Sequence, residues 1–131
     1  MKWELSDENL LVVTGVGNAL FAAHAMAAPK HFHNTYMSEA QTFNPTAWRW
    51  FAMPIACNAS QNFVLAASDT NKKALKNSLK AAGVGWLAAA GFTAYNVQEG
   101  IQRKEIGLAN AAGMALLGGL CLYRGCQDEE K

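Results

Sequence analysis

Residues 9–29, NLLVVTGVGNALFAAHAMAAP, contain no Asp, Glu, Lys or Arg. Three further stretches also lack these four residue types, namely 50–68, 81–98 and 106–123. The four stretches are 21, 19, 18 and 18 residues long, and a helix needs about 17–25 mostly apolar residues to cross the hydrocarbon core of a bilayer. The pattern predicts an all-α integral membrane bundle of four transmembrane helices, in a single domain that covers residues 1–131.

A soluble four-helix bundle rich in alanine is the alternative. Its helices would be amphipathic, with one charged face toward water. None of the four stretches carries a charge on any face over about five turns. The chain is also only 16% charged, against roughly 25% in an average soluble domain. Both observations favour the membrane bundle.

The expected helix ends agree with these boundaries. Ser6 is a candidate N-cap, and Asp7 and Glu8 follow it at the positive end of the first helix dipole. Pro29 predicts the end of the first helix, and Asn44-Pro45 predicts the start of the second. Aromatic residues, which concentrate where spans meet the headgroups, lie at the ends of the later stretches: Trp48, Trp50, Tyr95 and Tyr123.

Basic residues predict the orientation of the bundle. Four spans place the two termini and the loop 69–80 on one side, which holds seven basic residues: Lys2, Lys72, Lys73, Lys76, Lys80, Arg124 and Lys131. The other side holds four: Lys30, Arg49, Arg103 and Lys104. The positive-inside rule therefore predicts both termini on the cytoplasmic, matrix or stromal side. The formal net charge of +1 gives no support for nucleic-acid binding.

Small residues recur at four-residue spacing and predict the faces on which the helices pack against one another. In the last two stretches these faces are Ala81, Gly85, Ala89 and Thr93, and Gly107, Ala111, Ala115 and Gly119.

Three amides in the second stretch, Asn58, Gln61 and Asn62, are spaced to share one helix face. Two interpretations are open. The amides form hydrogen bonds between helices, or their oxygens bind a metal centre or a cofactor carbonyl.

His24 is the one histidine within the four stretches. Its alanine neighbours would leave lateral room for a flat macrocycle, and a neutral imidazole is a competent axial ligand. A hydrogen bond to a neighbouring helix is the other interpretation. The candidate cofactor-binding residues are therefore His24, Asn58, Gln61 and Asn62, and the sequence predicts no catalytic residue and no metal-ion site.

His31 and His33 form an H-x-H pair after the first stretch, and a metal there would need a further ligand. The alternative is an interfacial loop of roughly 17 residues that contacts a partner, longer than a bundle needs. The three cysteines, Cys57, Cys121 and Cys126, have no C-x-x-C spacing and are expected to be free thiols.

The segments HAMAAPKHFHNTYM at residues 24–37 and WRWFAMP at 48–54 resemble small multi-span accessory subunits of algal photosystem–antenna supercomplexes and other organelle membrane complexes. The resemblance implies a thylakoid location, with the mitochondrial inner membrane second, and contacts with chlorophyll and carotenoid. It implies His24 or one of the amides as a magnesium ligand.

Three functions remain open from the sequence. The first, which we favour, is a non-catalytic accessory subunit of a larger membrane complex, with other membrane subunits and lipids as its partners. The second is a small membrane enzyme or a quinone- or haem-handling protein that uses the histidines and amides. The third is a passive pore lined by the amide face. No ionisable carboxylate or base other than His24 lies within the stretches, which disfavours a proton pump or an ion-coupled transporter.

Overall fold

The computed structural model describes residues 5–68 and 71–127, and within them the chain forms five α-helices and no strand. They are α1 (Asp7–Ala27), α2 (Pro29–Tyr36), α3 (Pro45–Ala67), α4 (Lys72–Gln98) and α5 (Lys104–Cys126). The all-α prediction is confirmed. Lys2 and Lys131, which entered the charge comparison, lie outside the described residues.

The helix ends follow from local side chains. The Ser6 hydroxyl accepts a hydrogen bond from the Asn9 amide at 3.1 Å, and the Asn44 side chain accepts one from the Ala47 amide at 3.1 Å. Both satisfy backbone donors that a helix leaves free at its start. Between α4 and α5 the chain reverses at Gly100, whose φ of +71° favours glycine.

The short helix α2 was not expected. Residues 29–36 were assigned to the end of the first span and to an interfacial loop, but Pro29 occupies the first turn of a separate helix. Proline suits this position because its missing N–H has no partner in a first turn. The first long helix consequently ends at Ala27 instead of Pro29.

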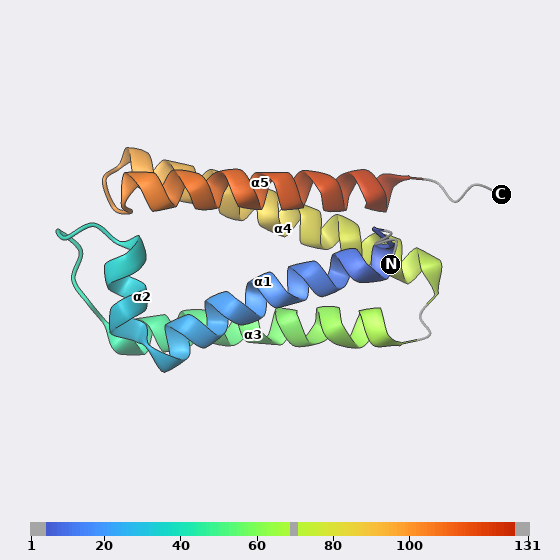
Figure 1. Ribbon diagram of the computed structural model, residues 1–131, viewed down its shortest axis with the longest axis horizontal. Helices are drawn as coiled ribbons and strands as arrows, with labels where there is room; N and C mark the ends of the chain where they lie inside the picture. The colour runs from blue at the N-terminus through green and yellow to red at the C-terminus, as the bar shows by residue number, and fades with distance from the viewer. Residues whose placement is uncertain (1–4, 69–70, 128–131) are drawn as a thin grey trace.

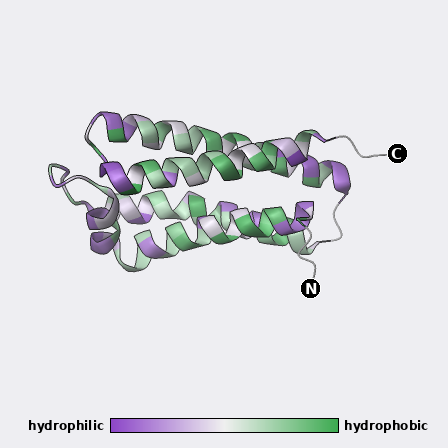
Figure 2. Cartoon of the chain, turned by 45° about the horizontal axis from the view of Figure 1, so that its top comes forward, coloured by the Kyte–Doolittle hydropathy of each residue, from purple (hydrophilic) through white to green (hydrophobic). Residues whose placement is uncertain are grey.

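The four long helices form two pairs, α1 with α3 and α4 with α5, and contacts between the pairs are few. Figure 1 shows α4 and α5 as one layer and α1 and α3 as the other, with α2 at one end. In the hydropathy view, hydrophilic residues gather toward both ends of the long helices and hydrophobic ones along their middles (Figure 2).

Two of the long helices, α1 and α5, are long and apolar enough to cross a membrane. Core helices of soluble proteins pass the same criterion. Helices α3 and α4 do not meet it, because α3 carries a cluster of amides and the charge-free part of α4 contains Thr93, Asn96 and Gln98 besides several glycines. The four-span arrangement therefore remains a prediction.

Glycine allows α4 and α5 to approach very closely. A Cβ on Gly118 would lie 2.9 Å from the Gly83 carbonyl oxygen, and a Cβ on Gly83 would lie 2.8 Å from the Gly118 carbonyl oxygen. The predicted stripe residues Gly85 and Gly119 have open space where a Cβ would be. The faces on which α4 and α5 pack therefore differ from those that the four-residue spacing predicted. One stripe residue, Gly107, does pack closely, against Val97.

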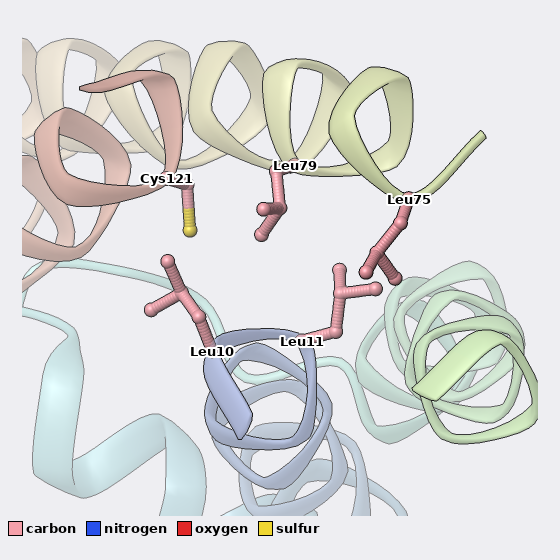
Figure 3. Close-up of a cluster of buried hydrophobic side chains, with 5 residues drawn as sticks. All are labelled: Leu10, Leu11, Leu75, Leu79 and Cys121. Atoms are coloured by element: carbon pink, nitrogen blue, oxygen red, sulfur yellow. The ribbon is translucent and has the colours of Figure 1, made fainter. Parts of the chain in front are cut away.

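The two pairs meet at one end through an apolar cluster and an ionic cluster. Leu10 and Leu11 of α1 point toward Leu75 and Leu79 of α4 and Cys121 of α5 (Figure 3). Beside them, the Asp7 carboxylate accepts from Lys76 Nζ at 2.8 Å and from the Arg124 guanidinium at 2.9 Å. Because Asp7 and Arg124 touch, α1 begins and α5 ends at the same end of the bundle.

We predict that Gly118→Val lowers the thermal unfolding midpoint of the detergent-solubilised chain, because the added side chain must push α4 away from α5. Overpacking of this kind costs about 1–3 kcal/mol. Gly113→Val is the matched control on the same helix, since nothing lies within 4 Å of its Cβ position. Equal midpoints for the two variants would contradict the close approach of α4 and α5.

Candidate functional site: a cavity between the two helix pairs

A cavity of about 610 Å³ lies between the two helix pairs. Such a volume is within the range of roughly 300–1,000 Å³ that small-molecule sites occupy. All five helices or the segments between them contribute to the wall, which is mainly apolar and aromatic. The cavity exists because the pairs touch mainly toward their ends.

Packed contacts join the two helix pairs toward both ends of the bundle. The cluster around Leu10 and Leu79 lies toward one end. At the other, the segment after α2 is tied to the α4–α5 turn by Ser38 N–H donating to Ile101 O at 3.0 Å and Arg103 N–H donating to Tyr36 O at 2.9 Å. Arg103 Nε also donates to Met37 O at 3.1 Å. Contacts between the pairs toward both ends fit a binding cavity better than a continuous pore.

One wall of the cavity is a cluster of aromatic rings centred on Phe32, which is 3% exposed. Its ring centroid lies 4.6 Å from that of Tyr36 and 5.0 Å from that of Trp48. Phe21 and Phe51 extend the cluster along the cavity. The cluster forms because α2 folds back over α1 and α3, and it presents flat apolar surfaces to the cavity.

The opposite wall consists of the predicted small-residue stripe of α4. Ala81, Gly85, Ala89 and Thr93 all line the cavity, so the stripe that was expected to contact another helix instead leaves space. Trp86, beside Gly85, packs against Gly17 of α1, where a Cβ would lie 3.4 Å from its ring. Small side chains on α4 thus determine the width of the cavity.

The amides divide into two groups. Asn58 lines the cavity and Asn62 is buried beneath it, 5% exposed, whereas Gln61 lies on the outer surface of α3. Asn58 Oδ1 accepts from Asn18 Nδ2 at 2.8 Å and from Asn62 Nδ2 at 3.2 Å. Of the three amides expected on one face, the structure brings two together and adds Asn18 from α1.

Asn62 also joins the two helices deeper in the core. Its Nδ2 donates to the Thr14 hydroxyl at 2.9 Å, and that hydroxyl donates to the Leu11 carbonyl at 2.8 Å. These bonds hold α1 and α3 together in a region without charged groups. Hydrogen bonds between helices in an apolar environment contribute about 0.6–2 kcal/mol each.

His24 lies outside the cavity wall. Its Nε2 lies 2.7 Å from His31 Nδ1, and its ring packs edge-on against Phe32 with centroids 5.1 Å apart. The lateral room that its alanine neighbours suggested is occupied by α2. His24 as a cofactor ligand therefore remains a prediction from the sequence.

His31 and His33 point to different partners. Trp48 Nε1 donates to His33 Nδ1 at 3.2 Å, so His33 Nε2 carries the proton and donates to the Gln41 carbonyl at 3.1 Å. His31 pairs with His24 instead. Within residues 5–68 and 71–127, no group of three or more His, Cys, Asp or Glu residues is arranged to hold a metal ion.

Tyr36 stands where the aromatic cluster meets the cavity. Burial raises the pKa of its phenol above the ordinary value of about 10. The hydroxyl therefore stays protonated at physiological pH and remains a hydrogen-bond donor at this end of the cavity.

The sequence indicated neither the cavity nor the part that Asn18, Asn96 and Asn110 take in its wall. Each of these was visible only as one amide on an apolar helix, and their convergence depends on how the two pairs are arranged. Comparison with protein families, curated proteins and solved structures finds no match for this chain.

We predict that Thr14→Val destabilises the chain by about 1 kcal/mol, because Asn62 loses its hydroxyl acceptor. The comparison is with Ser60→Ala, which removes an exposed hydroxyl that bonds only to Ala56 O of its own helix. A titration with a denaturing detergent measures the free energy of unfolding of both variants, and the two values are compared. If Ser60→Ala costs as much as Thr14→Val, the bond between Thr14 and Asn62 contributes nothing specific.

Proposed function

We propose that the chain crosses a membrane four times, through α1, α3, α4 and α5, and is a non-catalytic accessory subunit of a larger membrane complex. One observation carries the proposal. Large apolar side chains face outward on all four helices, with exposed fractions of 68% for Trp50, 66% for Phe92 and 77% for Leu116. Soluble monomers rarely expose such extensive apolar surface, whereas lipid solvates it.

The distribution of charge supports the same arrangement. One end of the bundle carries Asp7, Lys76, Lys80 and Arg124, and the other carries Lys30, Arg49, Arg103 and Glu105. Between them, the charge-free part of each helix is 18 residues or longer, which spans about 27 Å at 1.5 Å per residue. This length is close to the hydrocarbon thickness of about 30 Å.

Helices α3 and α4 have a lower average hydropathy because they contain more polar residues. Several of these polar side chains face inward. Asn62 and Asn96 are buried, and Asn58 faces the cavity. On α4 the polar Thr93 and Asn96 are buried, whereas α3 turns Ser60 and Gln61 outward together with large apolar side chains. We include both helices as spans because each has a charge-free part of 18 residues or longer and exposes large apolar side chains such as Trp50 and Phe92.

Gln61 favours a subunit of a complex over an isolated bundle. It is exposed near the middle of the charge-free part of α3, where an amide facing lipid has no hydrogen-bond partner. Such a group is expensive in hydrocarbon and acts in helix association. We therefore propose the outer face of α3 around Gln61 as a contact with a neighbouring membrane subunit. The photosynthetic setting remains an implication of the sequence resemblance alone.

We predict that a membrane-impermeant maleimide, added to open membrane sheets, labels Cys126 and leaves Cys57 unlabelled. Both thiols are exposed on the chain, but Cys57 would face the lipid and Cys126 the aqueous boundary. A polar reagent and the reactive thiolate both require water. Buried Cys121 is the internal control for a thiol that protein shields. Labelling of Cys57 at the rate of Cys126 would contradict a transmembrane α3.

We also predict that native electrophoresis of gently solubilised membranes places the chain in a large complex. Gln61→Leu is expected to move it to a small band, because the amide that contacts the neighbouring subunit is lost. Ser60→Ala, which alters the adjacent outward residue, should leave the large band intact. A small band for the unaltered chain would remove the accessory-subunit proposal.

A further inference from the structure

The hydrogen bonds between α1 and α3 fix which atoms of the amides face the cavity. Because the Thr14 hydroxyl donates to Leu11 O, it can only accept from Asn62, so Asn62 presents its Nδ2. Asn62 Nδ2 also bonds to Asn58, which must then present its oxygen. That oxygen accepts from Asn18, which must present its Nδ2. The orientation of each amide follows from the one before it.

The series leaves two polar atoms without a partner among the described residues. These are the Nδ2 group of Asn58, a donor, and the Oδ1 atom of Asn18, an acceptor. Both residues line the cavity, and the bond between them holds their amides side by side. A hydroxyl group can accept from the first and donate to the second at once, whereas a carbonyl can satisfy only the donor.

Asn96 provides a second, independent polar point toward the α2 end of the cavity. The residue is 8% exposed and lines the cavity; its backbone carbonyl accepts from the Ile101 and Gln102 amides, whereas its side-chain amide makes no hydrogen bond within residues 5–68 and 71–127. Buried amides normally find a partner, because an unpaired one costs free energy. The Asn96 amide is accessible from the cavity, so a polar atom of a bound molecule can pair with it there.

The remaining surface selects an elongated apolar body. The cavity follows α4 from Ala81 to Asn96, a separation of 15 residues that corresponds to about 22 Å of helix. Aromatic rings form one wall and small residues the other, which suits a flat, rigid ring system. Among the residues that the structure describes, no Asp, Glu, Lys or Arg lines the cavity, so a charged headgroup would find no counter-ion in its wall.

We propose that this cavity binds an isoprenoid-derived lipid with a ring hydroxyl, which accepts a hydrogen bond from Asn58 and donates one to Asn18. Sterols, phenolic chromanols and ring-hydroxylated carotenoids share this chemistry. The proposal rests on the proposed membrane placement, because the cavity would then lie within the bilayer that dissolves such lipids.

Dehydroergosterol, a fluorescent sterol, is the probe for this site. Energy transfer from tryptophan to it is measured for the full chain in phosphatidylcholine nanodiscs, since Trp48 and Trp86 line the cavity. We expect saturable transfer, and at least about tenfold weaker binding of its 3-methyl ether, which cannot donate a hydrogen bond. Equal binding of the two sterols would overturn the role of Asn18 as acceptor.

Two pairs of variants separate the site from the fold. Gly85→Leu places a side chain in the cavity and Gly91→Leu places the same side chain outside it, and neither Cβ would meet an atom within 4 Å. Of these two variants, only Gly85→Leu is expected to abolish the energy transfer from tryptophan to dehydroergosterol. Asn58→Leu should weaken binding about tenfold or more, and Gln61→Leu, on the outer surface of α3, should not. Unchanged binding by Gly85→Leu would overturn the proposal even if Asn58→Leu failed to fold.

Competition identifies the source of the ligand. Displacement of the probe by α-tocopherol points to a phenolic chromanol, displacement by zeaxanthin but not by β-carotene points to a hydroxylated carotenoid, and displacement by neither leaves a sterol.

The cysteine-labelling experiment tests the membrane placement independently of the ligand. If Cys57 is protected and no sterol binds, only the ligand proposal fails, whereas labelling of Cys57 removes the membrane placement regardless of binding.

Discussion

The structure depends on one constraint, which is that the middle of each long helix contains no charged residue. Ionic contacts are consequently confined to the ends, where Asp7 joins Lys76 and Arg124. In the middle, polar groups can be satisfied only by one another, and the bonds from Leu11 through Thr14 and Asn62 to Asn58 do this between α1 and α3. The absence of charged residues in the middle of the helices thus accounts for both the charge-free outer surface and the amide network inside.

Different contacts join the helices within each of the two pairs. Helices α4 and α5 approach through glycine, with Gly83 and Gly118 nearly in backbone contact, whereas α1 and α3 are joined by hydrogen bonds. The pairs meet mainly toward their ends, through the leucine cluster at one and the contacts of Tyr36 and Met37 with the α4–α5 turn at the other. The cavity lies where contacts between the pairs are few, with Trp86 of α4 against Gly17 of α1 as one of them.

Local features of the fold could be predicted from the sequence, and features that depend on the arrangement of helices could not. Ser6, Asn44 and Pro45 mark helix starts because capping is a property of a few adjacent residues. Helix α2 was missed because its eight residues are too few for a periodic pattern and begin with a proline, which also signals the end of α1. Four-residue spacing found the small residues of α4 but could not indicate which face meets α5, since Gly83 and Gly85 are both small.

The candidate site was predicted in part for the same reason. Asn58 was identified from its spacing with Asn62, but Gln61 belongs to the outer surface, and Asn18 and Asn96 gain importance only through residues distant in the sequence. His24 was singled out as the one histidine in a predicted span, and the structure places rings from α2 beside it, which could not be predicted because α2 itself was missed.

Polarised infrared spectroscopy of the chain in aligned bilayers tests the four-span arrangement most directly, because the amide I dichroism reports the mean tilt of all helices. With α1, α3, α4 and α5 all crossing the membrane, the dichroism should correspond to helices lying mostly along the bilayer normal. If only α1 and α5 cross and the other two lie in the membrane plane or outside it, the order parameter should fall to about half or less, and the four-span bundle would be contradicted.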